Sequence, residues 1–286
     1  MVLEVIKMTL KELKSIDVAH YTTVLTGISV LISIIVSMIL IGFFAVAVPG
    51  SVGIMIYILP TIIFGTLIWS VFSYFMQSTL YNILSKKIGG VKFDIKGNYI
   101  KSISSKETTI LASLITIIIT VIVYLAVSFI LPMILNSMLT VLMYSAQNEA
   151  ALALYQIMMI LNSPLVILAG LLIILIITLC ITLLSTYIYN ILGNSERGIT
   201  VELSSEGSYT ILDSLEPVNF AVAISAISLI INIISGIIMI INGNDILTTL
   251  LSILGGFITS FIACVLVAIF YNYLAPKIGK LKVELI

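Results

Sequence analysis

Side chains that could carry out catalysis are scarce in this 286-residue chain, of which only 9% is charged. Acid–base, phosphate and metal chemistry require paired carboxylates, a glycine-rich phosphate loop or clustered His and Cys ligands, and the sequence has none of these motifs. The single histidine, His20, lies beside Tyr21 at the start of an apolar segment, where an interfacial residue is expected rather than a ligand. Cys180 and Cys264 lie inside separate apolar segments, which indicates neither a disulfide framework nor a metal site. We therefore expect no enzymatic activity, no cofactor and no bound metal.

Small polar side chains inside the apolar segments are the remaining candidates for a functional site. Ser70, Thr178 and Ser260 each lie eleven residues before a Tyr-Asn pair. Neighbours at three- and four-residue spacing share a helix face with them. Such a stripe lets membrane helices approach closely, and the alternative is that it lines a narrow polar path on an axis. The stripe comprises Ser70, Ser73, Gln77, Thr178, Ser185 and Ser260.

The elements that position these residues follow from composition. Hydrophobic residues make up 60% of the chain and the mean hydropathy is +1.27, whereas soluble domains are about 45–50% apolar. Six uncharged segments exceed the roughly 20 residues that cross a bilayer core. The first is too long for a signal-peptide core, so we expect it to be retained. We predict an all-α polytopic membrane protein with spans at about Tyr21–Val48, Ile54–Leu80, Thr108–Leu135, Pro164–Ile188, Val218–Ile241 and Ile246–Phe270.

Charge placement predicts the orientation of these spans. All 13 lysines and arginines precede the first span, follow the last, or lie in the second and fourth connections. By the positive-inside rule that side is cytoplasmic, which puts both termini inside the cell membrane. The opposite side carries only Glu149 and Asp245 as charges. We expect lipid contact and no nucleic-acid partner, with anionic headgroups near the lysines as a by-product of topology.

A recurring signature closes each pair of spans. It begins with Tyr81-Asn82, Tyr189-Asn190 and Tyr271-Asn272, and ten residues after each Tyr comes an alternating apolar stretch typical of a short strand. Glycine precedes each stretch and permits a turn out of the helix. A Ser followed by Ile or Leu opens each pair of spans, as Ser15-Ile16, Ser102-Ile103 and Ser214-Leu215. The glycines are Gly89, Gly90, Gly198 and Gly279.

The signature divides the chain into three units, at residues 1–96, 97–204 and 205–286. Each unit crosses twice, so the three are parallel repeats, and three head-to-tail units close most simply into a pseudo-threefold ring. Each unit is expected to end in a short cytoplasmic β-strand. Ile6, Leu10 and Leu13 lie at helical spacing, which predicts an amphipathic N-terminal helix. A strand over residues 2–6 is the alternative.

The middle unit is longer because of an insertion at about residues 136–162 on the outward side. It contains several methionines around Gln147-Asn148-Glu149. Such a segment either lengthens spans three and four into an outward helical hairpin or lies along the outer interface. Flexible Met side chains suit an adaptable contact surface.

The closing signature resembles that of a family of small archaeal and actinobacterial two-span transmembrane proteins of unknown function. Their unit ends in Tyr-Asn-x-x-Ala-x-x-x-Gly-Gly-Ile-x-Val-x-Leu. Residues 271–285 match this best, with Lys280 at the second glycine, whereas the copy at residues 189–203 is the most divergent. The resemblance implies a triplicated membrane protein and implies no activity.

Two functions from different classes remain open. The absence of charged residues in the spans, together with the repeats, favours a scaffold or accessory subunit that binds other proteins of a membrane complex. The alternative is a channel or carrier for a small or apolar solute, with the serine and threonine stripe lining its route.

Overall fold

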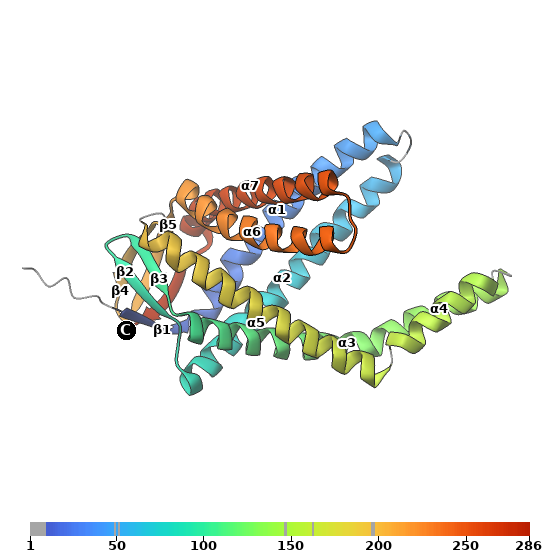
Figure 1. Ribbon diagram of the computed structural model, residues 1–286, viewed down its shortest axis with the longest axis horizontal. Coiled ribbons are helices and arrows are strands. Elements are labelled where there is room, and N and C mark those ends of the chain that lie inside the picture. Colours follow the sequence, from blue (N-terminus) through green and yellow to red (C-terminus); the bar gives the residue numbers. More distant parts are fainter. Residues whose placement is uncertain (1–9, 49, 51, 146–147, 162, 196–197) are drawn as a thin grey trace, which may run out of the picture. The chain divides into compact units, whose positions relative to one another are not determined.

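The computed structural model describes residues 10–48, 50, 52–145, 148–161, 163–195 and 198–286. The predictions for residues 2–9, and those that include Gln147 and Arg197, fall at least partly outside these ranges. Six of the helices are long and apolar enough to cross a membrane, as predicted, and they indicate a multi-pass membrane protein in contact with lipid. The helices are α1 (Val18–Ala47), α2 (Val52–Ile88), α3 (Ser105–Tyr144), α4 (Asn148–Leu161), α5 (Pro164–Asn194), α6 (Pro217–Ile241) and α7 (Ile246–Ile278), of which all but α4 are candidate spans (Figure 1).

The chain forms two compact parts. The first, which we call the sheet part, runs up to Thr108 and includes Leu183–Ile286. It contains α1, α2, α6, α7, the adjoining ends of α3 and α5, and all the strands. The second, the hairpin part, is Thr109–Thr182 and contains α4 with most of α3 and α5.

Short polar residues fix where the helices of the sheet part begin. Asp17 caps α1, accepting a hydrogen bond from the His20 backbone nitrogen at 3.0 Å. Asp245 caps α7 in the same way through Thr248, at 2.8 Å. Each carboxylate satisfies a backbone donor that has no partner within the helix. The caps therefore place the start of α1 just before the first predicted span and the start of α7 in the connection between the last two predicted spans.

Six short antiparallel strands form one sheet in the order β3-β2-β1-β6-β5-β4. Two pairs are hairpins that turn at Gly97 and Gly207, both with positive φ. The three predicted closing strands are present as β2, β4 and β6. The strands are β1 (Leu10–Ile16), β2 (Lys92–Lys96), β3 (Tyr99–Ile103), β4 (Val201–Glu206), β5 (Tyr209–Leu215) and β6 (Leu281–Leu285).

The two end strands of this order also meet. Tyr99 and Thr200 form an antiparallel bridge. Beside it, the Ile100 nitrogen donates to the Ile199 oxygen at 3.0 Å and the Val201 nitrogen donates to the Asn98 oxygen at 2.7 Å. This short contact joins the two ends of the order, and we call the closed set of six strands the strand ring. At the bridge, closure pairs backbone groups that would otherwise belong to open edges.

The core of the sheet part lies where helices meet beside the strand ring. Val24 and Ile28 of α1 pack against Tyr271 and Ala275 of α7. Ala223 and Ile227 of α6 pack in the same way against Ile188 and Tyr189 near the end of α5. Farther along, large side chains such as Trp69 and Leu251 are exposed, which is the arrangement expected of helices surrounded by lipid.

The N-terminal amphipathic helix was a wrong prediction for the described residues, because Leu10–Ile16 is strand β1. β1 pairs with β2 on one side and with β6 on the other, so the ring satisfies its backbone groups. Its register with β6 shifts between Leu13 and Ser15. Leu10 and Leu13 are three residues apart, a spacing that puts two residues on one face of a helix but on opposite faces of a strand. Leu10 is exposed in β1, whereas Leu13 is half-buried.

The insertion at residues 136–162 is helical where it is described. Its first part extends α3, which has 40 residues and is about 60 Å long at 1.5 Å per residue. That length is about twice the thickness of a hydrocarbon core. Its second part forms the separate helix α4 of 14 residues. Its position relative to the membrane stays a prediction.

Candidate functional site at the strand ring

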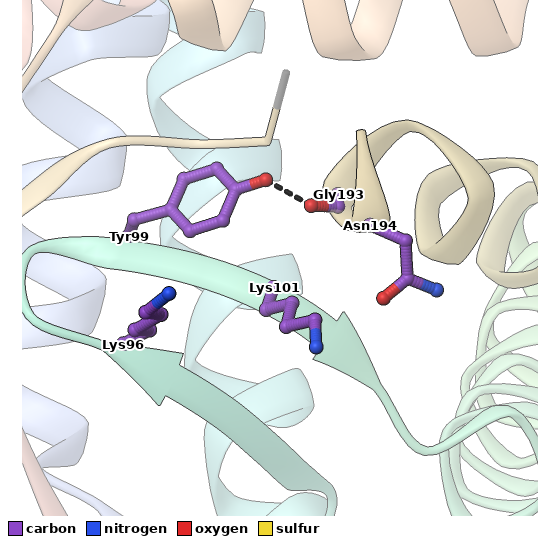
Figure 2. A pocket seen from close by; sticks show the side chains of 5 residues that line it. All are labelled: Lys96, Tyr99, Lys101, Gly193 and Asn194. Carbon is purple, nitrogen blue, oxygen red and sulfur yellow. Dashed lines mark hydrogen bonds between the residues drawn. The ribbon is translucent and has the colours of Figure 1, made fainter. Parts of the chain in front are cut away.

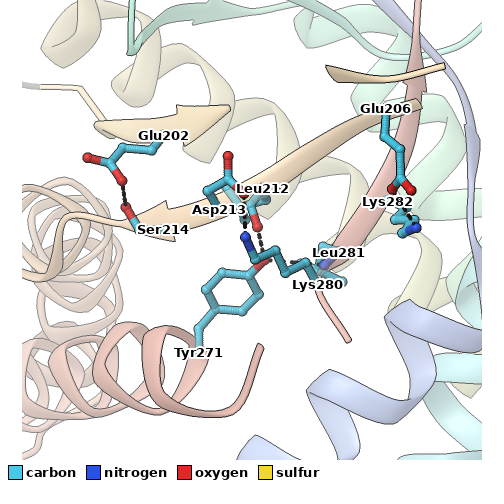
Figure 3. A network of polar contacts seen from close by, with 9 residues as sticks. All are labelled: Glu202, Glu206, Leu212, Asp213, Ser214, Tyr271, Lys280, Leu281 and Lys282. Atoms are coloured by element: carbon cyan, nitrogen blue, oxygen red, sulfur yellow. Dashed lines mark hydrogen bonds and ion pairs between the residues drawn. The ribbon is translucent and has the colours of Figure 1, made fainter. Parts of the chain in front are cut away.

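Through its hydroxyl group, each of the three predicted tyrosines connects the strand that opens its unit to residues at or just before the strand that closes it. The opening strands are β1, β3 and β5, and the closing strands are β2, β4 and β6. Tyr81, near the end of α2, donates to the Leu13 oxygen at 2.6 Å and accepts from the Val91 nitrogen at 3.1 Å. The other two make the same pair of contacts. Tyr189 contacts Ile100 and Ile199. Tyr271 contacts Leu212 and Leu281, as Figure 3 shows.

The asparagine after each tyrosine binds the residue with which the opening strand ends. The Asn82 amide nitrogen donates to the Ile16 oxygen, and its side-chain oxygen accepts from the Ile16 nitrogen, both at 2.8 Å. A carboxamide has both a donor and an acceptor, so it pairs with one residue as a neighbouring strand would. Asn190 binds Ile103 and Asn272 binds Leu215 in the same way. We call these three pairs of residues the Tyr-Asn clamps.

A serine and a carboxylate face each other where closing and opening strands of successive units pair. Ser15 Oγ donates to Glu284 at 3.0 Å, and Ser214 Oγ donates to Glu202 at 2.7 Å. Ser102 faces the buried Asp94 in the same register. The sequence identified the serines but missed their partners, although an acidic residue lies thirteen positions after each clamp tyrosine.

The predicted glycines have two different roles. Gly89 and Gly279 adopt φ angles of 89° and 118°, a region that side chains with a Cβ rarely occupy. Gly90 and Gly198 instead lie against backbone, since a Cβ would come within 2.0 Å of the Leu13 oxygen and 2.5 Å of the Ile100 oxygen. Both roles bring the end of the helix close to the opening strand.

The polar stripe is brought together only in part. In α2, Gln77 donates to Ser73 at 3.0 Å and accepts from the Tyr21 hydroxyl of α1 at 3.5 Å. Ser70 is buried nearby on α2, whereas Ser185 and Ser260 are half-buried. Thr178 belongs to the hairpin part and donates to the Ile174 oxygen of its own helix at 2.8 Å. A shared axis for these residues stays a prediction.

Two open pockets lie beside the clamps, each between an opening strand and the end of a helix. One has a volume of about 380 Å³ and is lined by Glu12, Lys14, Ser15, Ser85, Lys86, Gly89 and Glu284. The other has a volume of about 350 Å³ and is lined by Lys96, Tyr99, Lys101, Gly193 and Asn194. Figure 2 shows the second pocket, where the Tyr99 hydroxyl donates to the Gly193 oxygen.

Ion pairs join strands at the corresponding place near the third clamp (Figure 3). Lys280 lies 2.7 Å from Asp213, and Lys282 lies 2.7 Å from Glu206. The hydrogen bond from Lys280 lowers the pKa of Asp213, and that from Lys282 lowers the pKa of Glu206. The same bond raises the pKa of Lys282. These contacts connect charges around the ring and present no nucleophile beside an activating base.

The described residues contain no group of three or more His, Cys, Asp or Glu side chains arranged to bind a metal ion. The resemblance to the two-span family stays a prediction, because no family model, curated protein or solved structure matches the chain.

Proposed function

We propose that this protein is a non-enzymatic membrane scaffold or accessory subunit, built from three parallel two-helix units around a pseudo-threefold axis. The strand ring would be its cytoplasmic platform. The observation that carries the proposal is the closed ring, because the three Tyr-Asn clamps fasten it directly to the ends of α2, α5 and α7. A platform fastened in this way provides a rigid surface for partner proteins.

Equivalent strand pairings support the triplication. The pair β2–β3 aligns Phe93 with Ile103, β4–β5 aligns Val201 with Leu215, and β6–β1 aligns Val283 with Ile16. Each pairing then shifts register just after the position where a serine faces a carboxylate. The first two pairings are hairpins, whereas the third joins strands distant in sequence. Three head-to-tail contacts that return to the first unit form a closed ring without an unmatched interface.

The width of the ring favours a scaffold over a pore. In eight-stranded barrels the interior is just wide enough for side chains to fill it, and a six-stranded ring is narrower. Val91 and Val201 are buried in this ring. The predicted spans also carry no charged residue of the kind that binds ions or substrates within a membrane. A closed ring on the proposed axis would block an aqueous path.

The extended α3 and α4 are the proposed partner-binding segment on the outward side. Met138 and Met143 of α3 and Met159 of α4 are exposed. Methionine side chains adapt to different apolar surfaces, which suits a scaffold that binds another membrane protein.

Copurification from gently solubilised native membranes tests the scaffold. We expect a partner in fixed stoichiometry, and we expect its loss when residues 136–162 are replaced by a short polar turn. The matched control replaces only the loop at residues 242–244, which leaves the insertion intact. Recovery of a lone chain under several mild conditions would contradict the proposal.

Cysteine labelling in intact cells tests the proposed orientation. Cysteines introduced at Lys86 and Lys280 should be shielded from an impermeant reagent, whereas one at Asp245 should react. Reaction at Lys86 or Lys280 from outside would overturn the cytoplasmic placement of the strand ring.

A channel or carrier for a small or apolar solute is the second candidate function. It is favoured by the polar contacts among Tyr21, Ser73 and Gln77, which lie within the predicted spans. Liposomes containing the purified chain would then show solute flux that falls when Gln77 is changed to leucine. Absence of flux across a broad panel of solutes would rule against this function.

A further inference from the structure

We propose that the pocket formed by Lys96, Lys101 and Asn194 binds a phosphate-bearing anion, the headgroup of an anionic lipid. It rests on a comparison of three equivalent places in the strand ring, of which, among the described residues, this one has positive charge without a balancing carboxylate. It does not depend on whether the protein is a scaffold or a channel.

The three places have equivalent positions relative to the Tyr-Asn clamps. Lys101, Lys14 and Asp213 each follow the residue whose backbone oxygen accepts from a clamp tyrosine. Gly193 and Ser85 each lie four residues after such a tyrosine and border one of the two pockets. The same elements, an opening strand and the end of a helix, therefore surround all three places.

The three places differ in their balance of charged side chains. Around Lys14, the pocket contains Lys86 and also Glu12 and Glu284, so its formal charges cancel. Around Asp213, the Lys280 ammonium group forms an ion pair with the Asp213 carboxylate, at a distance of 2.7 Å between Nζ and Oδ1. Around Lys101, the described lining residues include Lys96 and no Asp or Glu.

Neither lysine of this pocket has an ion-pair partner within the part of the chain that the structure describes. Lys101 is half-buried there. A lysine removed from water without a carboxylate is costly unless an anion compensates it. The Asn194 amide and two ammonium groups supply the donors that phosphate oxygens accept.

Exposed apolar side chains beside the pocket favour a lipid as the source of the anion. Ile191 and Tyr187 lie about one and two turns before Asn194 on α5, and they are 54% and 64% exposed. Positions four residues apart share a helix face, so an apolar strip leads along α5 to the pocket. A lipid could place its acyl chains on this strip and its headgroup between the lysines, as basic pockets at helix ends do. The pocket volume of about 350 Å³ is within the range of small-ligand sites.

Native mass spectrometry of the full chain in detergent tests the assignment, with phosphatidylglycerol, phosphatidylcholine and inorganic phosphate as separate probes. We expect phosphatidylglycerol to bind most tightly and the K96Q/K101Q variant to bind it about 30-fold more weakly, since each lysine contributes about fivefold. The matched control, K14Q/K86Q, removes two lysines from the charge-balanced pocket and should change affinity less than about twofold. The K96R/K101R variant keeps the charges and should retain binding, which separates a lost site from a misfolded chain.

Each result decides the question. Equal binding of phosphatidylcholine, or equal losses in the two glutamine variants, would overturn the site. Displacement of phosphatidylglycerol by inorganic phosphate at similar concentration would retain the phosphate chemistry but overturn the lipid as its source.

Discussion

The sheet part and the hairpin part differ in what determines their structure. In the sheet part, polar side chains contact backbone groups far away in sequence, as Tyr271 does with Leu212. In the hairpin part, side-chain hydrogen bonds such as that from Ser137 to the Met133 oxygen and that from Thr178 to the Ile174 oxygen lie within one helix. Hydrogen bonds between residues distant in sequence determine how the elements of the chain pack together. Hydrogen bonds inside one helix do not determine what packs against that helix. We therefore expect the strand ring to determine the fold of the sheet part and the hairpin part to contribute little to it.

Removal of β6 should show this difference most strongly. Deletion of residues 281–286 eliminates two strand pairings and the nitrogen that donates to Tyr271. At about 1 kcal/mol for each backbone hydrogen bond, the loss should exceed about 5 kcal/mol. Thermal unfolding in detergent should lose its cooperative transition.

The matched deletion removes α4, residues 148–161, from the hairpin part. It should leave the unfolding transition of the sheet part within about 1 kcal/mol, because α4 contributes nothing to the ring. Comparable losses from both deletions would refute the contrast.

Substitution of a clamp asparagine should have the next largest effect. Asn272→Ala removes both hydrogen bonds to Leu215, and we expect a loss of about 2–3 kcal/mol in the free energy of unfolding. Asn219→Ala is the control, because its side chain makes one exposed contact with Thr200. If chemical denaturation gives both variants the same midpoint, the clamp does not stabilise the ring.

The tyrosine hydroxyl should contribute less, because phenylalanine keeps the buried ring. Tyr271→Phe leaves the Leu212 oxygen and the Leu281 nitrogen without this partner, with an expected cost of about 1–2 kcal/mol. Tyr273→Phe, two residues away on the same helix and exposed, should cost less than about 0.5 kcal/mol. Faster hydrogen exchange of the Leu281 amide in Tyr271→Phe, but not in Tyr273→Phe, would show that the lost stability comes from this hydrogen bond.

The smallest effect is expected from the exposed ion pair between Lys282 and Glu206. Because the folded-state pKa of Glu206 is below 4.5, the pair adds stability above that value and loses it as pH falls through the folded pKa. Because the folded-state pKa of Lys282 is above 10.5, the contribution persists until pH rises through that higher value. The melting temperature of Glu206→Gln should therefore differ slightly from that of the native chain at pH 7 and converge with it in acid. A constant difference across this range would exclude the ion pair as the cause.

Much of the helical structure could be predicted because it depends on local composition. An uncharged apolar segment such as Pro164–Ile188 satisfies its own backbone in lipid, so its length suffices to identify it. The Tyr-Asn pairs were also recognisable, since they recur at fixed distances from glycine and an alternating stretch.

Ring closure could not be predicted, because it depends on pairing between residues about 270 positions apart. The three-residue spacing of Leu10 and Leu13 is typical of a helix face, and β1 is a strand only because it pairs with β2 and β6, which are distant in sequence. The carboxylates opposite the serines were missed for a related reason. Glu284 becomes a partner of Ser15 only when β6 lies beside β1, and nothing local to either residue specifies that contact.

The pairing of β1 with β6 has a consequence for biosynthesis. The ribosome makes β1 before all six apolar helices and β6 after them, an interval of about 15–50 s at typical elongation rates. During that time β2 can cover one edge of β1, but the other edge stays open. The ring can close only after the last helix has entered the bilayer. A nascent chain that stalls within α7 would therefore present an unpaired strand to the quality-control machinery.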